Sequence, residues 1–390
     1  MINKPSGPFF QAIWLVGFRP FFALTFLLGF ALPLVWASLY SGYFNWDPSP
    51  LSPSQWHGHE MFFGFGWALL AGFLLTASKN WVSIRGLHGA GLALAAALWF
   101  VDRLVVSFYP TQDIFSLVLG NLFITYVVAY LLFTLIKYRA NDSFGDNYLF
   151  YIALPLFIPA KNLILDIDTF SQGIAMTTGL FRVTFVIMFE RTMAQFMKNA
   201  MNTPLPRLLW LDYSIKILML FSVVAVFLPD LYGAGLLIAT ASLLAFRFLI
   251  WKPHVGMKNF GIAVMYLGYL GLTIHLYLEG FRQLQGSLGV GALSLHVFTF
   301  FSMGMIIPSM MIRISQGHTG RKPIFLGRDR VALAFMALGG LSRVVFTQIW
   351  PDYYVIWVAL SGLGWSVCFA ILGLRLMPFL FQPRIDGKEH

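Results

Sequence analysis

Histidine is the side chain in this sequence whose spacing best suits metal chemistry. The stretch QWHGHEMFF places His57, His59 and Glu60 at the start of an otherwise apolar run, and His275 and His296 lie in two later apolar runs. Neutral imidazole is a common ligand of haem iron and of copper. His57 and His59 are two residues apart, so on a helix they point about 200° apart and cannot both face one partner. His59 is the better axial ligand, because it lies further into the apolar run.

The composition places these histidines in a membrane. Of the 390 residues, 58% are hydrophobic and 11% are charged, whereas soluble domains carry about 25% charged residues. We therefore expect an all-α polytopic membrane protein with a single domain over residues 1–390. The formal charge of +10 indicates basic cytoplasmic loops rather than nucleic-acid binding. Residues 1–17 lack the features of a removable signal peptide, and the single Cys368 excludes a disulfide framework and a c-type haem attachment motif.

Twelve apolar runs are long enough to cross a lipid bilayer as helices, which takes about 20 residues each. They are residues 18–40, 57–78, 88–108, 114–136, 148–165, 171–196, 209–228, 231–250, 259–281, 289–313, 330–349 and 354–378. The fifth run is the weakest, because it is short and contains Pro155 and Pro159. Proline is nevertheless tolerated in a span where neighbouring helices satisfy the freed carbonyl groups.

The connections between these runs alternate in charge. If the N-terminus is cytoplasmic, the inner connections hold most basic residues, such as Lys137, Arg139 and Arg321. The outer connections then hold acidic residues, such as Asp166 and Asp230. This alternation is what the positive-inside rule demands, and a missed span would invert it. The sequence therefore predicts twelve spanning helices with both termini in the cytoplasm.

The orientation gives each histidine a depth in the membrane. His57 and His59 fall at the outer end of the second run, His275 near the outer end of the ninth, and His296 in the outer part of the tenth. Ionisable residues inside a membrane are costly and are functional candidates by default. We expect His59 and His296 to be the axial pair of a haem, flanked by His57 and His275. A lone interfacial histidine more often only hydrogen-bonds a carbonyl group, so a structural role stays open for each.

Charged residues inside the runs allow two interpretations. Adjacent opposite charges, as in Asp102 beside Arg103 and Glu190 beside Arg191, favour internal ion pairs that hold helices together. In the functional interpretation, arginines in the outer half of the membrane neutralise the propionates of a haem. Arg103 and Arg343 lie at about the depth that this role requires.

One histidine lies in a cytoplasmic turn. His318 follows the tenth run, and a continuous helix would place it roughly 33 Å from His296. The two side chains therefore cannot share a metal. His318 either caps a helix end or belongs to a separate function on the cytoplasmic side, and the residues do not decide between these roles.

Five stretches resemble the NnrS family in their order and spacing, across nearly the whole chain. They are GFRPFF at 17–22, WHGHEMFFGF at 56–65, AGFLLTASKNW at 71–81, LH at 295–296 and GHTGR at 317–321. The resemblance implies a bacterial inner-membrane protein that contains haem and copper and is linked to nitric oxide, nitrosative stress and denitrification. Met61 could serve a copper ion through its thioether. Many members have a histidine where this chain has Tyr266, which weakens the expectation of a second metal site, of copper in particular.

The arrangement is also similar to subunit I of the haem-copper oxidases. That fold has twelve helices and holds its low-spin haem by histidines on the second and tenth. The histidines of this chain also fall on the second and tenth runs, whereas 171–196 and 209–228 contain none. The similarity implies a haem-copper-oxidase-like bundle without a dioxygen centre, and it is an analogy of arrangement only.

The leading hypothesis is a b-type haem membrane protein that protects against nitric oxide or nitrosative stress, with nitric oxide as a ligand. A second hypothesis is a twelve-helix secondary transporter whose site comprises Lys161, Arg182 and Glu190. A third is an assembly or metal-delivery factor for denitrification enzymes, with the outer histidines passing copper. The residues leave open which histidines are axial, whether copper binds, what donates electrons and whether the chain is an enzyme.

Overall fold

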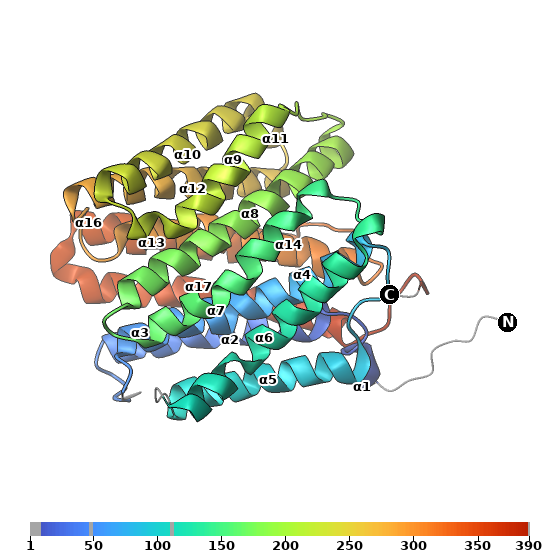
Figure 1. Ribbon diagram of the computed structural model, residues 1–390, viewed down its shortest axis with the longest axis horizontal. Coiled ribbons are helices and arrows are strands. Elements are labelled where there is room, and N and C mark those ends of the chain that lie inside the picture. The colour runs from blue at the N-terminus through green and yellow to red at the C-terminus, as the bar shows by residue number, and fades with distance from the viewer. Residues whose placement is uncertain (1–8, 47–49, 110–112, 389–390) are drawn as a thin grey trace.

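The computed structural model describes residues 9–46, 50–109 and 113–388. Within these ranges the chain forms helices and no strands, which confirms the all-α fold. The long helices lie roughly side by side in one bundle (Figure 1). The predicted cytoplasmic position of the two chain ends falls outside the described residues.

The bounds of the α-helices fall into two groups along the chain. The first half contains α1 (Phe9–Ala12), α2 (Phe18–Tyr40), α3 (Pro53–His59), α4 (Trp67–Trp81), α5 (Gly89–Phe108), α6 (Ile114–Lys137), α7 (Leu149–Leu165) and α8 (Phe170–Met201). The second half contains α9 (Leu209–Phe221), α10 (Asp230–Ile250), α11 (Pro253–Gly256), α12 (Phe260–Gln285), α13 (Leu293–His296), α14 (Gly304–Gly317), α15 (Gly327–Leu341), α16 (Thr347–Ile349) and α17 (Tyr354–Leu380).

Short segments of other helix types join or interrupt these α-helices. The π-helical segments are η1 (Glu60–Gly66), η5 (Val297–Met303) and η6 (Ser342–Phe346). The 3-10 segments are η2 (Arg139–Asn141), η3 (Gly145–Tyr148), η4 (Ser222–Phe227) and η7 (Pro351–Tyr353). Each π segment lies inside a longer helix, so α3, η1 and α4 form one continuous rod, as do α13, η5 and α14.

Among the described residues, twelve helices are long and apolar enough to cross a membrane. Each coincides with one predicted run, which confirms the count, and the differences are confined to the ends. The second span begins at Pro53 instead of residue 57. Pro155 and Pro159 lie within the continuous helix α7, so the weakest predicted span is also confirmed.

The second span begins at a defined cap. The Ser52 side chain accepts a hydrogen bond from the backbone N–H of Gln55, and the Gln55 side chain accepts one from the backbone N–H of Ser52. Pro53 occupies the first helical position, where its missing N–H costs nothing. Gln55 also donates to the backbone carbonyl of Ile164 in α7, 3.2 Å away. The cap and this bond fix the place where the two histidines of the motif enter the bundle.

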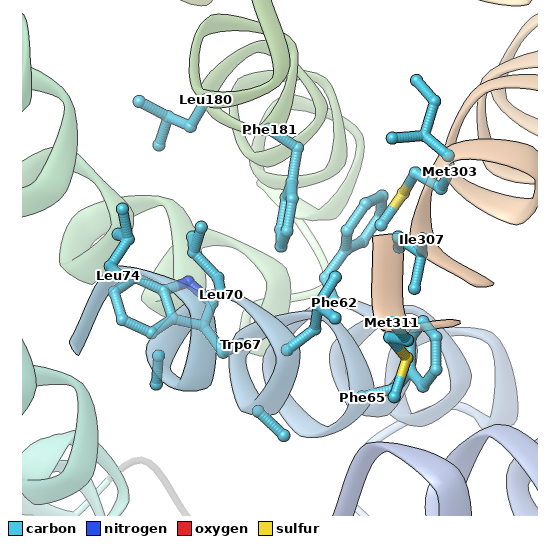
Figure 2. Packing of buried hydrophobic residues seen from close by; sticks show 14 of the residues in the cluster. Phe62, Phe65, Trp67, Leu70, Leu74, Leu180, Phe181, Met303, Ile307 and Met311 are labelled. Atoms are coloured by element: carbon cyan, nitrogen blue, oxygen red, sulfur yellow. The ribbon is translucent and has the colours of Figure 1, made fainter. Parts of the chain in front are cut away.

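The second span forms the centre of the bundle. It is 83% buried over its apolar window, more than any other span. Figure 2 shows Phe62 and Trp67 of this span packed toward Phe181 of α8 and Met303 of η5. Glycines permit close contacts along it, because a Cβ at Gly72 would come within 2.9 Å of Phe21 in α2. The first and last spans, α2 and α17, also pack against each other.

The bundle has two distinct ends. The first, which we call the α3 end, carries α3, α13 and α16, on the left in Figure 1. The second, the α11 end, carries α1, α11 and the last described residues, on the right. Because successive spans run in opposite directions, the basic connections predicted to be cytoplasmic all meet at the α11 end.

Candidate functional site

A cavity of about 650 Å³ lies at the α3 end of the bundle. Its walls come from α2, α3, η1, α8, η4, α10, α12, α13, η5, η6 and α17, together with the glycine-rich connection 286–292. We call it the histidine cavity, because His57, His275 and His296 line it, together with Arg182 and Arg343. It therefore collects three of the four predicted histidines and one of the two predicted arginines.

The fourth histidine, His59, does not line this cavity. It is fully buried on another face of the same rod, and its Nδ1 lies 3.0 Å from Oε1 of Glu60. The expectation that the two histidines of the motif face different partners is therefore confirmed. The cavity brings His57 and His296 together. His59, which we expected to pair with His296, does not line it.

His57 lines the cavity, and its ring is held by stacking on a tryptophan. The ring lies on the indole of Trp36 in α2, with centroids 4.2 Å apart and planes 16° apart. Its Nδ1 is buried and has no hydrogen-bond partner among the described residues. A buried polar nitrogen without a partner is costly, so His57 is a candidate functional residue.

His296 presents one ring nitrogen to the cavity. Its Nδ1 lies 2.7 Å from the backbone carbonyl oxygen of Ala292. A carbonyl oxygen only accepts, so Nδ1 carries the proton and Nε2 keeps its lone pair. Metal-binding histidines commonly use this arrangement, in which the second nitrogen donates to a carbonyl group. His57 and Arg343 both lie close enough to His296 to interact with it electrostatically.

His275 uses both ring nitrogens within the protein. Its Nδ1 lies 2.8 Å from the backbone carbonyl oxygen of Ser294, so Nδ1 donates there. Its Nε2 therefore accepts, and Nη1 of Arg182 lies 3.4 Å from it. A guanidinium beside the free nitrogen disfavours a metal cation at that position. His275 thus differs from His57 and His296, although it lines the same cavity.

The π-helical segments coincide with the predicted site residues. His59 directly precedes η1, His296 directly precedes η5, and Arg343 lies within η6. Single π turns inside α-helices occur frequently at functional sites. Sequence periodicity did not reveal them, because the apolar pattern of each span continues through the π turn.

Two arginines lining the cavity have no carboxylate partner within the described residues. Nη1 of Arg343 donates to the hydroxyl of Tyr354 at 2.7 Å, and Nη2 of Arg182 donates to the carbonyl oxygen of Ser222 at 3.2 Å. The side chain of Glu279 also lines the cavity, but Arg282 binds it at 2.7 Å. The cavity wall therefore carries more positive than negative charge.

Arg103, the other arginine expected beside a cofactor, belongs to a separate group that we call the Asp102 cluster. Its members are His59, Glu60, Asp102, Arg103 and Lys161. Arg103 approaches Asp102 at 2.7 Å and Glu60 at 3.1 Å, and Lys161 approaches Asp102 at 2.6 Å. These contacts join the second, third and fifth spans. The ion pair predicted from the adjacency of Asp102 and Arg103 is confirmed.

A second group, the Glu190 cluster, lies nearer the α11 end. It comprises Asp146, Glu190, Arg191, Arg207, Asp212, Lys216 and Arg247. Glu190 approaches Lys216 at 2.9 Å and Arg247 at 3.3 Å, and Arg191 approaches Asp146 at 2.5 Å. Glu190 and Arg191 are thus ion-paired as predicted, although each pairs with residues of other helices and not with its neighbour.

The positions considered for copper are dispersed. Tyr266 is buried, and its hydroxyl donates to the backbone carbonyl of Trp251. It does not line the histidine cavity, whereas Met61 does. In the described part of the chain no group of three or more His, Cys, Asp or Glu side chains is arranged to hold a metal ion. A copper site built on such a group therefore has no counterpart here.

The remaining motif stretches meet at the α11 end. The backbone N–H of Phe18 donates to Oγ1 of Thr76 at 2.8 Å, and the Phe18 ring lies 5.5 Å from that of His318. The backbone N–H of His318 donates to the carbonyl of Ile314, which makes His318 the cap of α14. Arg384 donates to the carbonyl oxygen of His318 at 3.3 Å. His318 therefore stands at the C-cap position of α14 and joins the first and tenth spans to the C-terminal segment, while a separate function of its side chain stays a prediction.

Comparison with known proteins agrees with the motif resemblance. A family model described as NnrS protein matches residues 12–384. No curated protein matches the chain. The matched range contains every histidine of the cavity and all members of both charge clusters.

Proposed function

The chain belongs to the NnrS family, and on that premise we propose that it binds a b-type haem in the histidine cavity and acts in the nitric oxide response. Family membership supports a role in the nitric oxide response. The twelve apolar helices make the chain a multi-pass membrane protein. The haem, its ligands and the orientation in the membrane are the parts that we propose.

One observation carries the proposal. Two histidines from different spans, His57 and His296, line one cavity and keep ring nitrogens to which no described protein group bonds. Histidine nitrogens held this way are suited to iron at an axial position. The cavity volume of about 650 Å³ lies within the range of roughly 300–1,000 Å³ typical of cofactor and ligand sites.

The proposal replaces His59 by His57 in the expected axial pair. Nδ1 of His59 is engaged by Glu60, and its Nε2 is buried without a partner. Arg103 and Lys161 lie close enough to His59 to act on it electrostatically. Glu60 and Asp102 balance these cations, and His59 does not line the cavity, so it supports the helix packing in this proposal.

The walls of the cavity fit a flat, dianionic macrocycle. Aromatic side chains line it, among them Trp36, Phe62, Phe300 and Trp365. Arg343 lies within electrostatic range of both proposed ligands and has no carboxylate partner among the described residues. A haem propionate would give Arg343 the negatively charged partner that it lacks among the described residues. Arginine binds carboxylates through two parallel hydrogen bonds.

The protein contributes binding and orientation. When bound, a haem with two histidine ligands carries single electrons, whereas one with a single histidine ligand keeps a position for nitric oxide. Trp36 fixes the ring of His57, and the Ala292 carbonyl fixes the tautomer of His296. Both contacts hold the nitrogens in place before any ligand arrives.

We propose that the α11 end faces the cytoplasm of a bacterium and the cavity faces the outer side of the inner membrane. Basic residues gather at the α11 end, namely Lys79, Arg85, Lys137, Arg139, Lys198, Arg207, Lys252, Lys258, Arg321, Lys322, Arg328 and Arg330. The positive-inside rule assigns such an end to the cytoplasm.

The contacts do not favour the transporter alternative. Its three residues have different partners, because Lys161 binds Asp102, Glu190 binds Lys216, and Arg182 lines the cavity. The metal-delivery alternative needs copper at the outer histidines. His275, which borders Arg182, is poorly suited to hold it.

The proposal is tested by the visible spectrum of the detergent-purified protein, oxidised and reduced, from cells supplied with haem. We expect a b-type spectrum in the wild type and its loss or alteration in His57→Ala and His296→Ala. His59→Ala is the matched control, two residues from His57, and should keep the wild-type spectrum. Purified wild-type protein without haem absorbance would overturn the proposal, and a change in His59→Ala alone would return the axial role to His59.

A second experiment tests the link to nitric oxide. Reduced protein is titrated with nitric oxide under exclusion of oxygen, and the haem absorbance is followed. A stoichiometric shift identifies an open or exchangeable iron position, whereas an unchanged spectrum restricts the haem to electron transfer. Growth of a deletion strain under nitric oxide, with and without the His296→Ala variant, then connects the site to protection.

A further inference from the structure

Arg182 is a buried cation that no carboxylate of the described residues pairs. Its residue surface is 3% exposed, and it forms no ion pair among the described residues. Other buried cations in the bundle, such as Lys161, Lys216, Arg247 and Arg375, each have a carboxylate partner. A buried charge without a partner is costly, and in a membrane it marks a functional position.

Two neutral acceptors orient the guanidinium of Arg182. Nη1 lies 3.4 Å from Nε2 of His275, and Nη2 lies 3.2 Å from the carbonyl oxygen of Ser222. Each contact uses one N–H group, so the Nε–H and a second N–H on each terminal nitrogen remain. The Nε atom is itself buried and has no hydrogen-bond partner in the described part of the chain. A buried, oriented and incompletely satisfied guanidinium therefore borders the histidine cavity.

The carboxylate that acts electrostatically on Arg182 is already engaged. Glu279 lies within electrostatic range of Arg182, but Arg282 binds both of its oxygens, at 2.7 Å and 3.2 Å. The charged residues lining the cavity are Arg182, Arg282, Arg343 and Glu279, three cations against one anion. With neutral histidines the wall therefore has a formal charge of +2.

We propose that Arg182 is the centre of a binding site for a small planar oxyanion, which enters through the histidine cavity. The second N–H groups of the two terminal nitrogens match two oxygens of a carboxylate or nitrite-like ion. His275 and Ser222 are positioning residues, because they hold the guanidinium through its other N–H groups. The bound anion supplies the negative charge that the protein does not.

Two anions with the same chemistry could occupy this site: a free oxyanion or a propionate of the haem proposed above. Only the propionate rests on the proposed function. The experiment separates them by measuring anion affinity and haem content on the same samples. Full-length protein is purified in detergent with a bulky buffer anion. Nitrite and formate are then titrated by calorimetry into the wild type, Arg182→Gln and Arg207→Gln. The last variant removes the same charge from an exposed residue at the other end of the bundle.

We expect the wild type to bind nitrite or formate, Arg182→Gln to lose at least tenfold in affinity, and Arg207→Gln to match the wild type. Unchanged haem content in Arg182→Gln then identifies a free ion as the occupant. If haem-loaded wild type excludes both ions and Arg182→Gln lowers haem content severalfold, the oxyanion is a propionate. If neither anion affinity nor haem content depends on Arg182, the proposal is wrong.

Two further variants keep the test informative. Arg182→Lys retains the charge but not the planar fork, so it should weaken binding severalfold and replaces Arg182→Gln if that variant does not fold. His275→Gln removes the acceptor that orients the guanidinium, and it should weaken binding without abolishing it. If the wild type contains no haem, the proposed function fails while the titration with free ions still decides the role of Arg182.

Discussion

The histidine cavity and the two charge clusters bury the same kinds of side chain and satisfy them differently. In the Asp102 cluster, Lys161 and Arg103 face the carboxylates of Asp102 and Glu60. In the cavity, Arg182 and Arg343 face neutral acceptors and open space. The Asp102 cluster therefore balances its two cations with two carboxylates, whereas the cavity leaves its charge for a ligand.

Buried charges inside a membrane bundle differ in whether the protein itself pairs them. A buried ion pair can join spans without further function, and its loss leaves a charge with no compensation. A buried arginine without a carboxylate instead indicates a missing anion. Both regions consist of high-cost residues, so cost alone does not mark the functional site, and pairing separates the two.

The largest expected effect is in the Asp102 cluster. Lys161→Met leaves Asp102 with one cation fewer in a buried setting, and we expect the free energy of unfolding to fall by about 3–5 kcal/mol. Detergent-to-SDS titration measures it. The double variant Asp102→Asn with Lys161→Met should recover part of the loss, and an unchanged stability in Lys161→Met would remove the distinction between cluster and cavity.

His318, which lies outside the spans, should make the stability of the protein depend on pH. Burial, together with the nearby cations Lys79, Arg384 and Arg19, lowers the pKa of His318 to about 4 from its ordinary 6.5. The unfolded chain therefore binds this proton more readily than the folded protein. Stability should fall as the pH drops from about 6.5 toward 4, by about 2 kcal/mol.

The matched variant for this pH effect is His318→Gln. It cannot titrate, so its loss of stability between pH 6.5 and 4 should be smaller than that of the wild type by the same amount. Thermal unfolding at a series of pH values measures both. Parallel pH profiles for the two proteins would contradict a neutral, buried His318.

A substitution in the cavity should change the free energy of unfolding much less than one in the Asp102 cluster. Arg182→Met removes a buried charge that has no carboxylate partner, so in haem-free and oxyanion-free protein we expect a stability change of about 1 kcal/mol or less, in either direction. Titration under the conditions used for Lys161→Met measures it. A loss as large as that of Lys161→Met would show that Arg182 is structurally paired after all.

The smallest effect is expected at the edge of the Glu190 cluster. The side chain of Arg207 is 65% exposed, although it approaches Glu190 at 3.0 Å. Exposed ion pairs contribute about 0–1 kcal/mol, so Arg207→Ala should change stability by less than about 1 kcal/mol and less at high salt. A larger loss would place this arginine with the buried members of the cluster.

The sequence predicted the spans better than the site. Hydropathy summed over about 20 residues averages out local ambiguity, and even α7 with Pro155 and Pro159 was recovered. The adjacency of Asp102 and Arg103 predicted a real ion pair. The sequence does not separate Arg182 from the other buried charges, because a single sequence cannot show which buried charge lacks a partner from another helix.

The choice between His57 and His59 shows the limit for the site. Spacing alone indicated that the two face different ways, which the structure confirms. Depth in the apolar run favoured His59, yet His57 lines the cavity. Depth is a position along the helix axis, whereas facing is a rotation about it. That rotation depends on contacts with other spans, such as the contact of Gly72 in the second span with Phe21 in the first.

The sequence by itself determined the membrane class, the twelve helices and the gathering of basic connections at one end. Each follows from the chemistry of contiguous residues, because transfer into lipid depends on local composition. Only the tertiary structure decided which histidines meet, which charges cancel and which arginines remain uncompensated. These depend on the relative rotation of helices far apart in the chain and on π turns such as η5, since each turn re-aims side chains that the apolar pattern leaves undetermined.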